Sequence, residues 1–354
     1  MDRGAPAGAA AGTRGFVSDN CSGIHPEVLA AIAGANAGHQ PSYGDDEVTQ
    51  RLQKIFRRHF GGTALGYPVL TGTGANVVAL RAMTGRWGAV LCSADAHINT
   101  DEGGAPEQLA GLKLDAVPAP GGKLRPEQIA AFAEAAGDVH GAQPEVVSLT
   151  QPTEWGVVYS VDELARLCAA AHERGLLVHM DGARLCNAAA ALDLRLRAIT
   201  TDVGVDVVSF GGTKIGLMLG EAVVILNPAA VPGAEFARKS TTQLASKMRF
   251  ISAQFEALLG DDLWWRIASH GNRMARLMEA GLRSAAGVEI LHEVDANAVF
   301  AAMPPAVVDR LRGRFPLQIS GPAVGLVRLM MSFDTTEQDV EDFVRAVYQE
   351  AAPG

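Results

Sequence analysis

One lysine in this sequence stands where an amine could act as a nucleophile. Lys214 lies in the run Ser209-Phe210-Gly211-Gly212-Thr213-Lys214-Ile215-Gly216, which follows a stretch of apolar residues. A lysine just past the carboxyl end of a buried strand lies at the sheet edge where open α/β folds bind ligands. Partial burial there would lower the pKa of the amine and make it a usable nucleophile. The alternative is a lysine in a solvent-facing loop, and the local context alone favours neither interpretation.

An aspartate is expected at the same sheet edge. Asp181 ends the apolar run 176–180 and begins the segment Asp181-Gly182-Ala183-Arg184. A carboxylate there can pair with a protonated ring nitrogen and keep it cationic, which a pyridoxal phosphate cofactor needs to act as an electron sink. For an aspartate taken alone, the alternative is a helix N-cap. Beside Lys214, the cofactor role is the favoured interpretation.

Two further motifs follow predicted strands. Gly72, Thr73 and Gly74 lie between a strand and a helix, where backbone amides can hold a phosphate. They do not form the dinucleotide fingerprint, because its third glycine and an acidic ribose partner are missing. His97, in Asp95-Ala96-His97, follows another strand and could stack on an aromatic cofactor or act as a base near neutral pH. The alternatives are an ordinary turn and a structural histidine.

Strands that alternate with helices are expected to position these residues. The apolar runs predict strands at 69–70, 89–92, 113–117, 146–149, 176–180, 205–210 and 222–226. Helical patterns between them cover 75–83, 126–136 and 161–174. Such alternation is typical of a mostly parallel, buried sheet.

The pattern changes near Pro228 and predicts a second domain. Residues 233–286 are almost entirely helical in pattern. Strands are then expected at 288–292, 298–302 and 326–331, and helices at 307–314 and 337–348. We therefore predict a flexible tail over 1–15, a large α/β domain over 16–230 with an N-terminal helical segment, and a small α+β domain over 231–354.

Length and composition exclude several classes of protein. A chain of 354 residues is long enough for about two domains. With 48% hydrophobic and 19% charged residues, it is not a disordered, fibrous or coiled-coil protein. A net charge of −9 without a basic cluster argues against nucleic-acid binding.

No apolar stretch is long enough to span a membrane and no secretory signal is apparent, so we expect a cytoplasmic protein. The cysteines have no metal-ligand spacing, so we expect reduced thiols and no metal site: Cys21, Cys92, Cys168 and Cys186.

Taken together, the motifs resemble the fold-type I pyridoxal phosphate enzymes. More closely, they resemble the threonine aldolase branch of the β-eliminating lyase family, and within it the low-specificity and phenylserine aldolases. The resemblance covers nearly the whole chain, from Ser18-Asp19-Asn20 to Val327-Arg328-Leu329. Its other motifs are Tyr43-Gly44-Asp45-Asp46, the glycine turn, Ala96-His97, Glu102-Gly103-Gly104-Ala105-Pro106-Glu107, Asp181-Gly182-Ala183-Arg184 and the lysine loop.

The resemblance implies a fold and an activity. The fold would be a large domain with a mostly parallel seven-stranded sheet flanked by helices, plus a smaller C-terminal α+β domain. The activity would be cleavage of L-threonine, L-allo-threonine or a related β-hydroxy-α-amino acid, such as phenylserine, to glycine and an aldehyde. The cofactor would be pyridoxal 5′-phosphate. The enzyme would be a homotetramer with a dimer as the minimal active unit.

The resemblance also implies roles for single residues. Lys214 would bind the cofactor aldehyde, Asp181 would face the pyridinium nitrogen, and His97 would stack on the ring. Gly72, Thr73 and Gly74 would hold the phosphate. Ser18, Arg184 and Arg328 would hold the substrate carboxylate, since a guanidinium donates two parallel hydrogen bonds to such a group. Tyr43, as a substrate contact, and Arg249, as a cofactor contact, would reach the site of a neighbouring subunit.

The chain departs from the common family pattern in two places. Thr153 stands where many aldolases of the family carry a second histidine, and Gly-Thr-Lys-Ile-Gly replaces the common Ser-Lys-Gly-Leu-Gly around the lysine. The base that takes the β-hydroxyl proton therefore stays open, with His97, directly or through water, as first candidate. Other pyridoxal phosphate reactions on the same scaffold are the main alternative: another lyase, a racemase or an aminotransferase. A binding protein without activity and a nicotinamide-dependent dehydrogenase are more distant ones.

Overall fold

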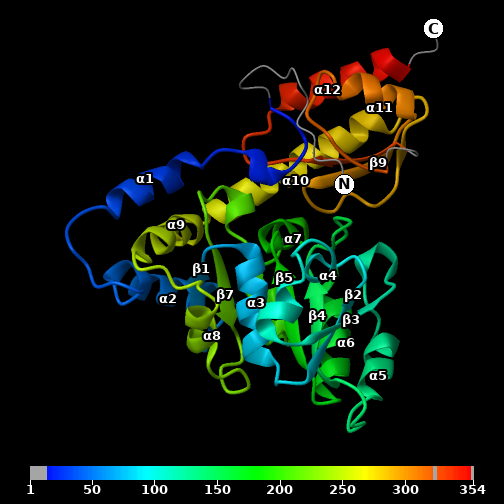
Figure 1. Ribbon diagram of the computed structural model, residues 1–354. Coiled ribbons are helices and arrows are strands. Elements are labelled where there is room, and N and C mark those ends of the chain that lie inside the picture. The colour runs from blue at the N-terminus through cyan, green and yellow to red at the C-terminus, as the bar shows by residue number, and fades with distance from the viewer. Residues whose placement is uncertain (1–13, 322–324, 352–354) are drawn as a thin grey trace.

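The structure of the chain is a computed structural model that describes residues 14–321 and 325–351. Most of the tail predicted over 1–15 lies outside these residues. The described part contains a seven-stranded sheet and a four-stranded sheet. In Figure 1 the larger sheet occupies the lower part of the molecule and the smaller sheet lies above it, beneath the C-terminal helices. No helix of the described residues is long and apolar enough to cross a membrane.

The larger sheet is mostly parallel, which confirms the predicted fold class. Its strand order is β1-β7-β6-β5-β4-β2-β3. The contacts among β2, β3, β4, β5 and β6 are parallel, and β7 runs antiparallel to both β6 and β1. The strands are β1 (Leu65–Val69), β2 (Gly88–Ser93), β3 (Lys113–Val117), β4 (Gln143–Thr150), β5 (Leu177–Gly182), β6 (Val207–Phe210) and β7 (Glu221–Ile225).

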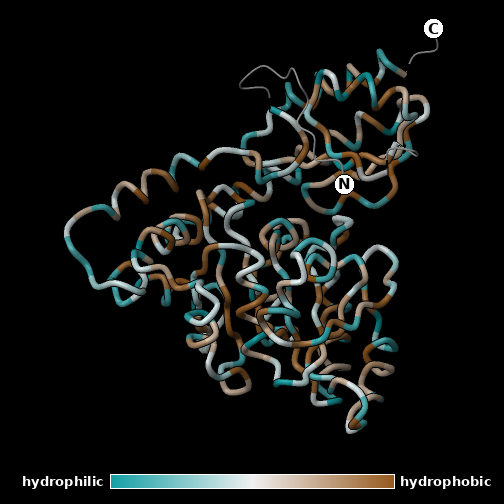
Figure 2. The backbone as a smooth tube through the Cα atoms, in the orientation of Figure 1, coloured by the Kyte–Doolittle hydropathy of each residue, from teal (hydrophilic) through white to brown (hydrophobic). Residues whose placement is uncertain are grey.

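Both faces of this sheet are buried, because its strands alternate side chains between two hydrophobic cores. In β2, Leu91 faces one core and Val90 and Cys92 face the other. The same alternation places Val147 and Val146 of β4 on opposite faces. This explains why the parallel strands read as continuous apolar runs in the sequence. Figure 2 shows these hydrophobic stretches along the middle of the sheet.

Helices cover the two faces. On one side lie α3 (Gly72–Met83) and α8 (Ala234–Ser240), whose apolar residues share a core with the sheet. The other core includes residues of α5 (Pro126–Ala133), α6 (Val161–His172) and α7 (Leu185–Ala191). It also includes residues of α1 (Pro26–Gly34), α2 (Glu47–Phe60) and α9 (Arg249–Gly260), which pack on one another beside β1.

The short elements are η1 (Asp19–Cys21), α4 (His97–Thr100), η2 (Pro106–Ala110), η3 (Pro120–Gly122), η4 (Leu196–Ile199), η5 (Thr201–Val203) and η6 (Thr213–Ile215).

The smaller sheet is antiparallel and has its own core. Its strand order is β10-β11-β9-β8, and its core includes residues of α10, α11 and α12. The strands are β8 (Glu289–Ile290), β9 (Ala298–Ala302), β10 (Gln318–Gly321) and β11 (Leu326–Met330), and the helices are α10 (Leu263–Leu282), α11 (Pro305–Leu311) and α12 (Glu337–Ala351). The long α10 packs on α7 of the large sheet as well as on α12.

The domain division predicted at 230/231 stays a prediction. Within the segment assigned to the small domain, α8 and α9 pack on α3, α1, α2 and β1, which belong to the large sheet and its helices. We therefore propose that the small domain begins within α10.

Candidate active site

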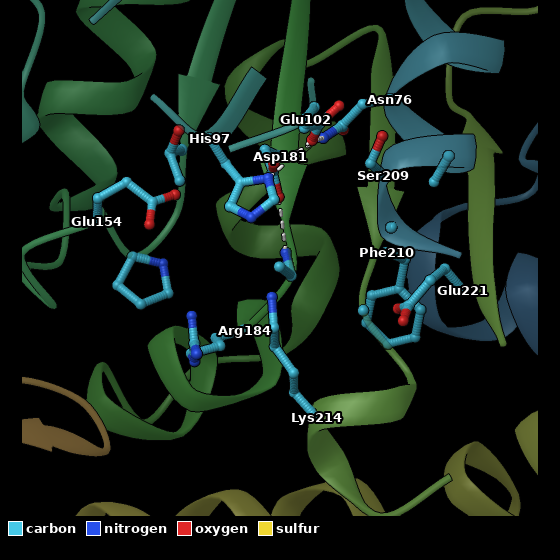
Figure 3. A pocket seen from close by; sticks show the side chains of 16 residues that line it. Asn76, His97, Glu102, Glu154, Asp181, Arg184, Ser209, Phe210, Lys214 and Glu221 are labelled. Carbon is cyan, nitrogen blue, oxygen red and sulfur yellow. Dashed lines mark hydrogen bonds and ion pairs between the residues drawn. The ribbon is translucent and has the colours of Figure 1, made fainter. Parts of the chain in front are cut away.

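A cavity opens at the carboxyl ends of the parallel strands. This is the edge at which open α/β sheets bind ligands. Five residues singled out from the sequence line it: Gly72, His97, Asp181, Arg184 and Lys214. Figure 3 labels the last four of them. The side chains come from loops after different strands and from the start of α3, so the fold brings together residues that are far apart in the sequence.

Lys214 lies in η6, directly after β6, and its half-buried side chain lines the cavity. Two features hold its loop. The backbone amides of Gly212 and Thr213 donate to the Glu221 carboxylate, at 2.5 and 3.4 Å. A Cβ at Gly211 would lie 2.1 Å from the backbone oxygen of Ala183, so only glycine fits there. The lysine loop is therefore packed directly against the loop that follows Asp181.

Asp181 lies near the carboxyl end of β5 and is 6% exposed. Asn76 Nδ2 donates to its Oδ2 at 2.9 Å, and the Ala183 amide donates to Oδ1 at 3.0 Å. The N-cap of the next helix, α7, is Arg184 and not Asp181. The helix-cap alternative is therefore not what the structure shows, and the carboxylate faces the cavity.

The glycine turn forms the start of α3. Thr71 is the N-cap, and its side chain accepts the amide of Gly74 at 3.0 Å. The amides of Gly72 and Thr73 have no acceptor in the described part of the chain. Gly72 lines the cavity, whereas Thr73 and Gly74 do not. A Cβ at Gly74 would lie 2.3 Å from the Gln243 side chain, so this glycine allows the loop before α9 to pack on the start of the helix.

His97, the first residue of α4, is held by a buried carboxylate. Its Nδ1 lies 2.9 Å from Glu102 Oε1. Asn76 Nδ2 donates to the same oxygen at 2.7 Å and also to Asp181, so one amide links the two carboxylates. The hydrogen bond with Glu102 raises the pKa of His97, and this outweighs the opposing effect of burial. The pairing therefore favours the imidazolium form of His97.

Sequence reasoning missed Glu154, which also lines the cavity. It follows β4 in the segment that includes Pro152, preceded by a cis peptide bond, and Thr153. Thr153, at the position of the expected second histidine, does not line the cavity; it is buried beside Gly122. Burial and the Asp181 carboxylate raise the pKa of Glu154 against the lowering effect of nearby cations. The signal available in the sequence was an acidic residue in the loop after a buried strand.

Arg184 contacts both the cavity and a buried acid. Its Nε and Nη2 donate to Asp19 Oδ2 and Oδ1, at 2.7 and 2.9 Å. Burial lowers the pKa of Arg184, but Asp19 and the carboxylates of the cavity raise it by more than burial lowers it. The guanidinium therefore stays charged. Asn297 Nδ2 donates to the same Asp19 carboxylate at 3.1 Å. Asp19 thus fixes the guanidinium through Nε and one terminal nitrogen.

Ser18 and Arg328 do not line the cavity. The Ser18 hydroxyl accepts the amide of Asn20 at 3.2 Å at the start of η1. Arg328 Nη2 donates to the Val17 carbonyl at 3.1 Å and to Gln318, whereas its buried Nε has no partner among the described residues. Burial, and then the charge of Arg184, lower the pKa of Arg328, so the two guanidinium groups lie close enough to repel each other.

Tyr43 and Arg249 also lie outside the cavity of their own chain. Tyr43 is 50% exposed and has a positive φ of 61°, and Lys239 Nζ lies 4.7 Å from its ring centroid. Arg249, the first residue of α9, donates to the Gly38 carbonyl at 3.2 Å. The two residues therefore do not contribute to the site within one chain.

Comparison with known proteins shows similarity along nearly the whole chain. A family model described as beta-eliminating lyase matches residues 15–305. The low specificity L-threonine aldolases of Pseudomonas aeruginosa and of a Pseudomonas species are each 41% identical over 336 residues, which cover 95% and 94% of this chain and 97% of each relative. The solved structure of threonine aldolase from Leishmania major is similar with a TM-score of 0.90 at 31% identity, covering 95% of this chain and 99% of that one.

Proposed function

Because the chain belongs to the β-eliminating lyase family, in its threonine aldolase branch, we propose that it is a pyridoxal 5′-phosphate-dependent aldolase. It cleaves the Cα–Cβ bond of L-threonine, L-allo-threonine or a related β-hydroxy-α-amino acid, such as phenylserine, to give glycine and an aldehyde. The observation that carries the proposal is the convergence of Lys214, Asp181 and the start of α3 in one cavity.

The residues of the cavity fit this cofactor. The Lys214 amine can condense with its aldehyde, and the Asp181 carboxylate can face its protonated ring nitrogen. The unpaired amides at the start of α3, together with the positive end of the helix dipole, suit its phosphate. Asn76 Oδ1 and Glu102 Oε2 are buried without a partner among the described residues, as expected where a ligand completes a site.

The residues of this chain bind and orient the substrate. Arg184 offers the terminal nitrogen that Asp19 does not hold, and Arg328 adds a second cation for the substrate carboxylate. The Ser18 hydroxyl lies 3.4 Å from Asp19, the partner of Arg184. This supports the assignment of Ser18 to the substrate carboxylate. The bond to Glu102 fixes the His97 ring at the cavity, where it would stack on the cofactor ring.

The reaction then breaks the Cα–Cβ bond. When bound, the cofactor supplies an electron sink for the pair left at Cα. Asp181 maintains the positive charge that this requires, and a base removes the proton of the β-hydroxyl as the carbonyl of the aldehyde forms. Lys214 would be the residue that holds the cofactor between turnovers.

The first test is a product assay on the purified protein with added pyridoxal 5′-phosphate. L-threonine, L-allo-threonine and phenylserine are each expected to give glycine and aldehyde in equal amounts. Lys214→Ala is expected to abolish turnover, because the amine that binds and releases the cofactor is gone. Full activity of Lys214→Ala, or ammonia and a keto acid in place of glycine, would contradict the proposal.

We also propose a homotetramer with a dimer as the minimal active unit. Support comes from Tyr43 and Arg249, which lie away from the cavity of their own chain and so suit a neighbour's. Mixing Lys214→Ala with Arg249→Ala subunits is expected to restore activity that neither has alone, as measured after subunit exchange. We place the enzyme in the cytoplasm, where the four cysteines, free among the described residues, stay reduced.

A further inference from the structure

We propose that Glu154 is the base that takes the proton of the substrate β-hydroxyl. This replaces the first candidate from the sequence, His97, and rests on the proposed aldol cleavage. The residue was not part of any assigned motif, and it comes from the loop after β4 where the second histidine was expected.

The position of Glu154 suits this role. Figure 3 shows its carboxylate on the same side of the cavity as the His97 ring, pointing inward. No group in the part of the chain that the structure describes donates a hydrogen bond to this carboxylate. Each of the other carboxylates of the cavity already accepts at least one hydrogen bond: Asp181 and Glu102 accept from Asn76, and Glu221 accepts from the lysine loop. Glu154 is therefore the carboxylate of the cavity that has no donor among the described residues.

The loop around Glu154 is anchored on both sides. Before it, the Thr153 amide donates to the Val157 carbonyl at 2.9 Å. After it, Trp155 Nε1 donates to Asp95 at 3.0 Å, and the indole packs against Phe300 of the small sheet with ring centroids 5.3 Å apart. These contacts fix the backbone of Glu154, so its carboxylate enters the cavity from a defined position.

His97 is less suited to accept this proton. Glu102 binds its Nδ1 and raises its pKa, which favours the ring that already carries both protons. A protonated imidazole can stack and donate, but it cannot act as a base. The pairing with Glu102 therefore suits His97 to positioning the cofactor and the substrate and not to accepting the proton.

The charges that face Glu154 come from several elements. Burial and the Asp181 carboxylate raise its pKa, and the cations around it lower the pKa without cancelling that rise. A carboxylate with a raised pKa is a stronger base than an ordinary glutamate. The facing charged groups are His97 of α4, Asp181 of β5, Arg184 before α7, Lys214 of η6 and Arg328 of β11.

The step balances without another reactant. The β-hydroxyl O–H bond breaks and its proton moves to a Glu154 oxygen. The electron pair of that bond forms the second carbon–oxygen bond of the aldehyde as the Cα–Cβ bond breaks. The pair from the Cα–Cβ bond remains at Cα until a proton is added there to give glycine. Glu154 loses its proton to water before the next turnover.

The test is Glu154→Gln, which keeps the size of the side chain and removes its basicity. The retro-aldol kcat is expected to fall by roughly 10²- to 10⁴-fold, the usual contribution of a general base. Two properties that need no hydroxyl base are expected to persist: binding of pyridoxal 5′-phosphate, measured by absorbance titration of the apoprotein, and exchange of the Cα protons of glycine in D₂O, measured by NMR. The wild-type acid limb of the kcat–pH profile is expected to disappear in the residual activity.

A matched control and a second variant complete the design. Glu173→Gln removes an exposed carboxylate at the C-cap of α6 and is expected to leave every readout unchanged. Glu154→Asp keeps the charge but withdraws it by one methylene, so it is expected to retain the acid limb with kcat reduced about tenfold or more. It also serves as the test if the glutamine variant does not fold.

The possible failures can be distinguished. If wild-type protein releases no glycine and aldehyde from any of the three substrates, the proposed function fails, whatever Glu154 does. If wild type cleaves and Glu154→Gln cleaves within a few-fold of it, the inference is wrong. Loss of cofactor binding and glycine exchange together with cleavage would also overturn it, because that pattern indicates a structural role.

Discussion

At the scale of single residues, the carboxylates of the cavity differ in the groups that donate hydrogen bonds to them. Asp181 accepts from Asn76 and a backbone amide, Glu102 from Asn76 and His97, and Glu154 from nothing described. The same chemical group can thus stabilise a cation, orient an imidazole or take a proton, depending on its contacts. The sequence identified Asp181 because it ends an apolar run. Glu154 has only its place in the loop after a buried strand as a local signal, and the roles of Glu102 and Glu154 depend on contacts made only after folding.

The contact between Glu102 and His97 leads to a prediction for Glu102. In Glu102→Gln the charge that raises the pKa of His97 is removed while the side chain keeps its size, so the pKa of His97 is expected to fall toward or below 6.5. NMR titration of the His97 ring signals in the apoprotein measures this shift. His25 is the control because it does not pair with Glu102, and its titration is expected to be unchanged. An unchanged pKa at His97 would show that the pairing with Glu102 does not set its protonation.

At the scale of elements, the site depends on how tightly the loops after β5 and β6 pack. The amide of Gly211 donates to the Gly182 carbonyl at 3.0 Å, and Glu221 at the start of β7 holds the next two amides. The lysine and the aspartate are therefore aligned by backbone contacts between neighbouring strands. The parallel pairing of β5 with β6, in which Asp181 lies opposite Ser209, fixes this register.

Gly211→Ala is expected to disturb this alignment. The added methyl would lie 2.1 Å from the Ala183 oxygen, and backbone on both sides must shift to admit it. We expect kcat to fall at least tenfold with the cofactor bound more weakly, because Lys214 and Asp181 no longer keep their spacing. Gly62→Ala is the control, because this loop glycine, like Gly211, has no positive φ, and the space around its Cβ is open. Equal losses in both variants would mean that the close contact at Gly211 is not what matters.

The elements themselves were largely predictable where the hydrophobic pattern was strong. β9 and β3 have the predicted bounds, because short apolar runs bounded by turn residues have few other interpretations. The short β10 and the brief α4 and η6 were not predicted, because each lasts only a turn or a few residues and depends on tertiary contacts. The packing of α8 and α9 on the large sheet could not be read from helical periodicity either, which identifies a buried face but not its partner.

At the scale of the whole molecule, the segment around Asp19 joins the two sheets. Its carboxylate binds Arg184 beside the large sheet and Asn297 just before β9, and Arg328 of β11 donates to the Val17 carbonyl. The N-terminal segment also pairs with the small domain through the Phe16 carbonyl, which accepts the amide of Met330 at 2.9 Å. One short stretch of chain thus sets the small domain against the cavity and holds the guanidinium proposed to bind substrate.

Asp19→Asn is expected to weaken this junction in a pH-dependent way. Burial raises the pKa of Asp19, but Arg184, Lys214 and Asn297 together lower it below its usual value of 3.8. Folding therefore favours the ionised form of Asp19. Its contribution to the free energy of unfolding is fully present above about pH 5 and is lost as the pH falls through the lower folded pKa. Removing the charge leaves Arg184 buried without its anionic partner, which lowers the free energy of unfolding by about 3–5 kcal/mol.

Urea unfolding of wild type and Asp19→Asn between pH 3 and 8 measures this loss. Asp202→Asn is the control, since the pair of Asp202 with Arg197 is exposed. The gap between wild type and Asp19→Asn is expected to be constant above about pH 5 and to narrow in acid; a gap independent of pH would mean that packing, and not the charge on Asp19, holds the two sheets together.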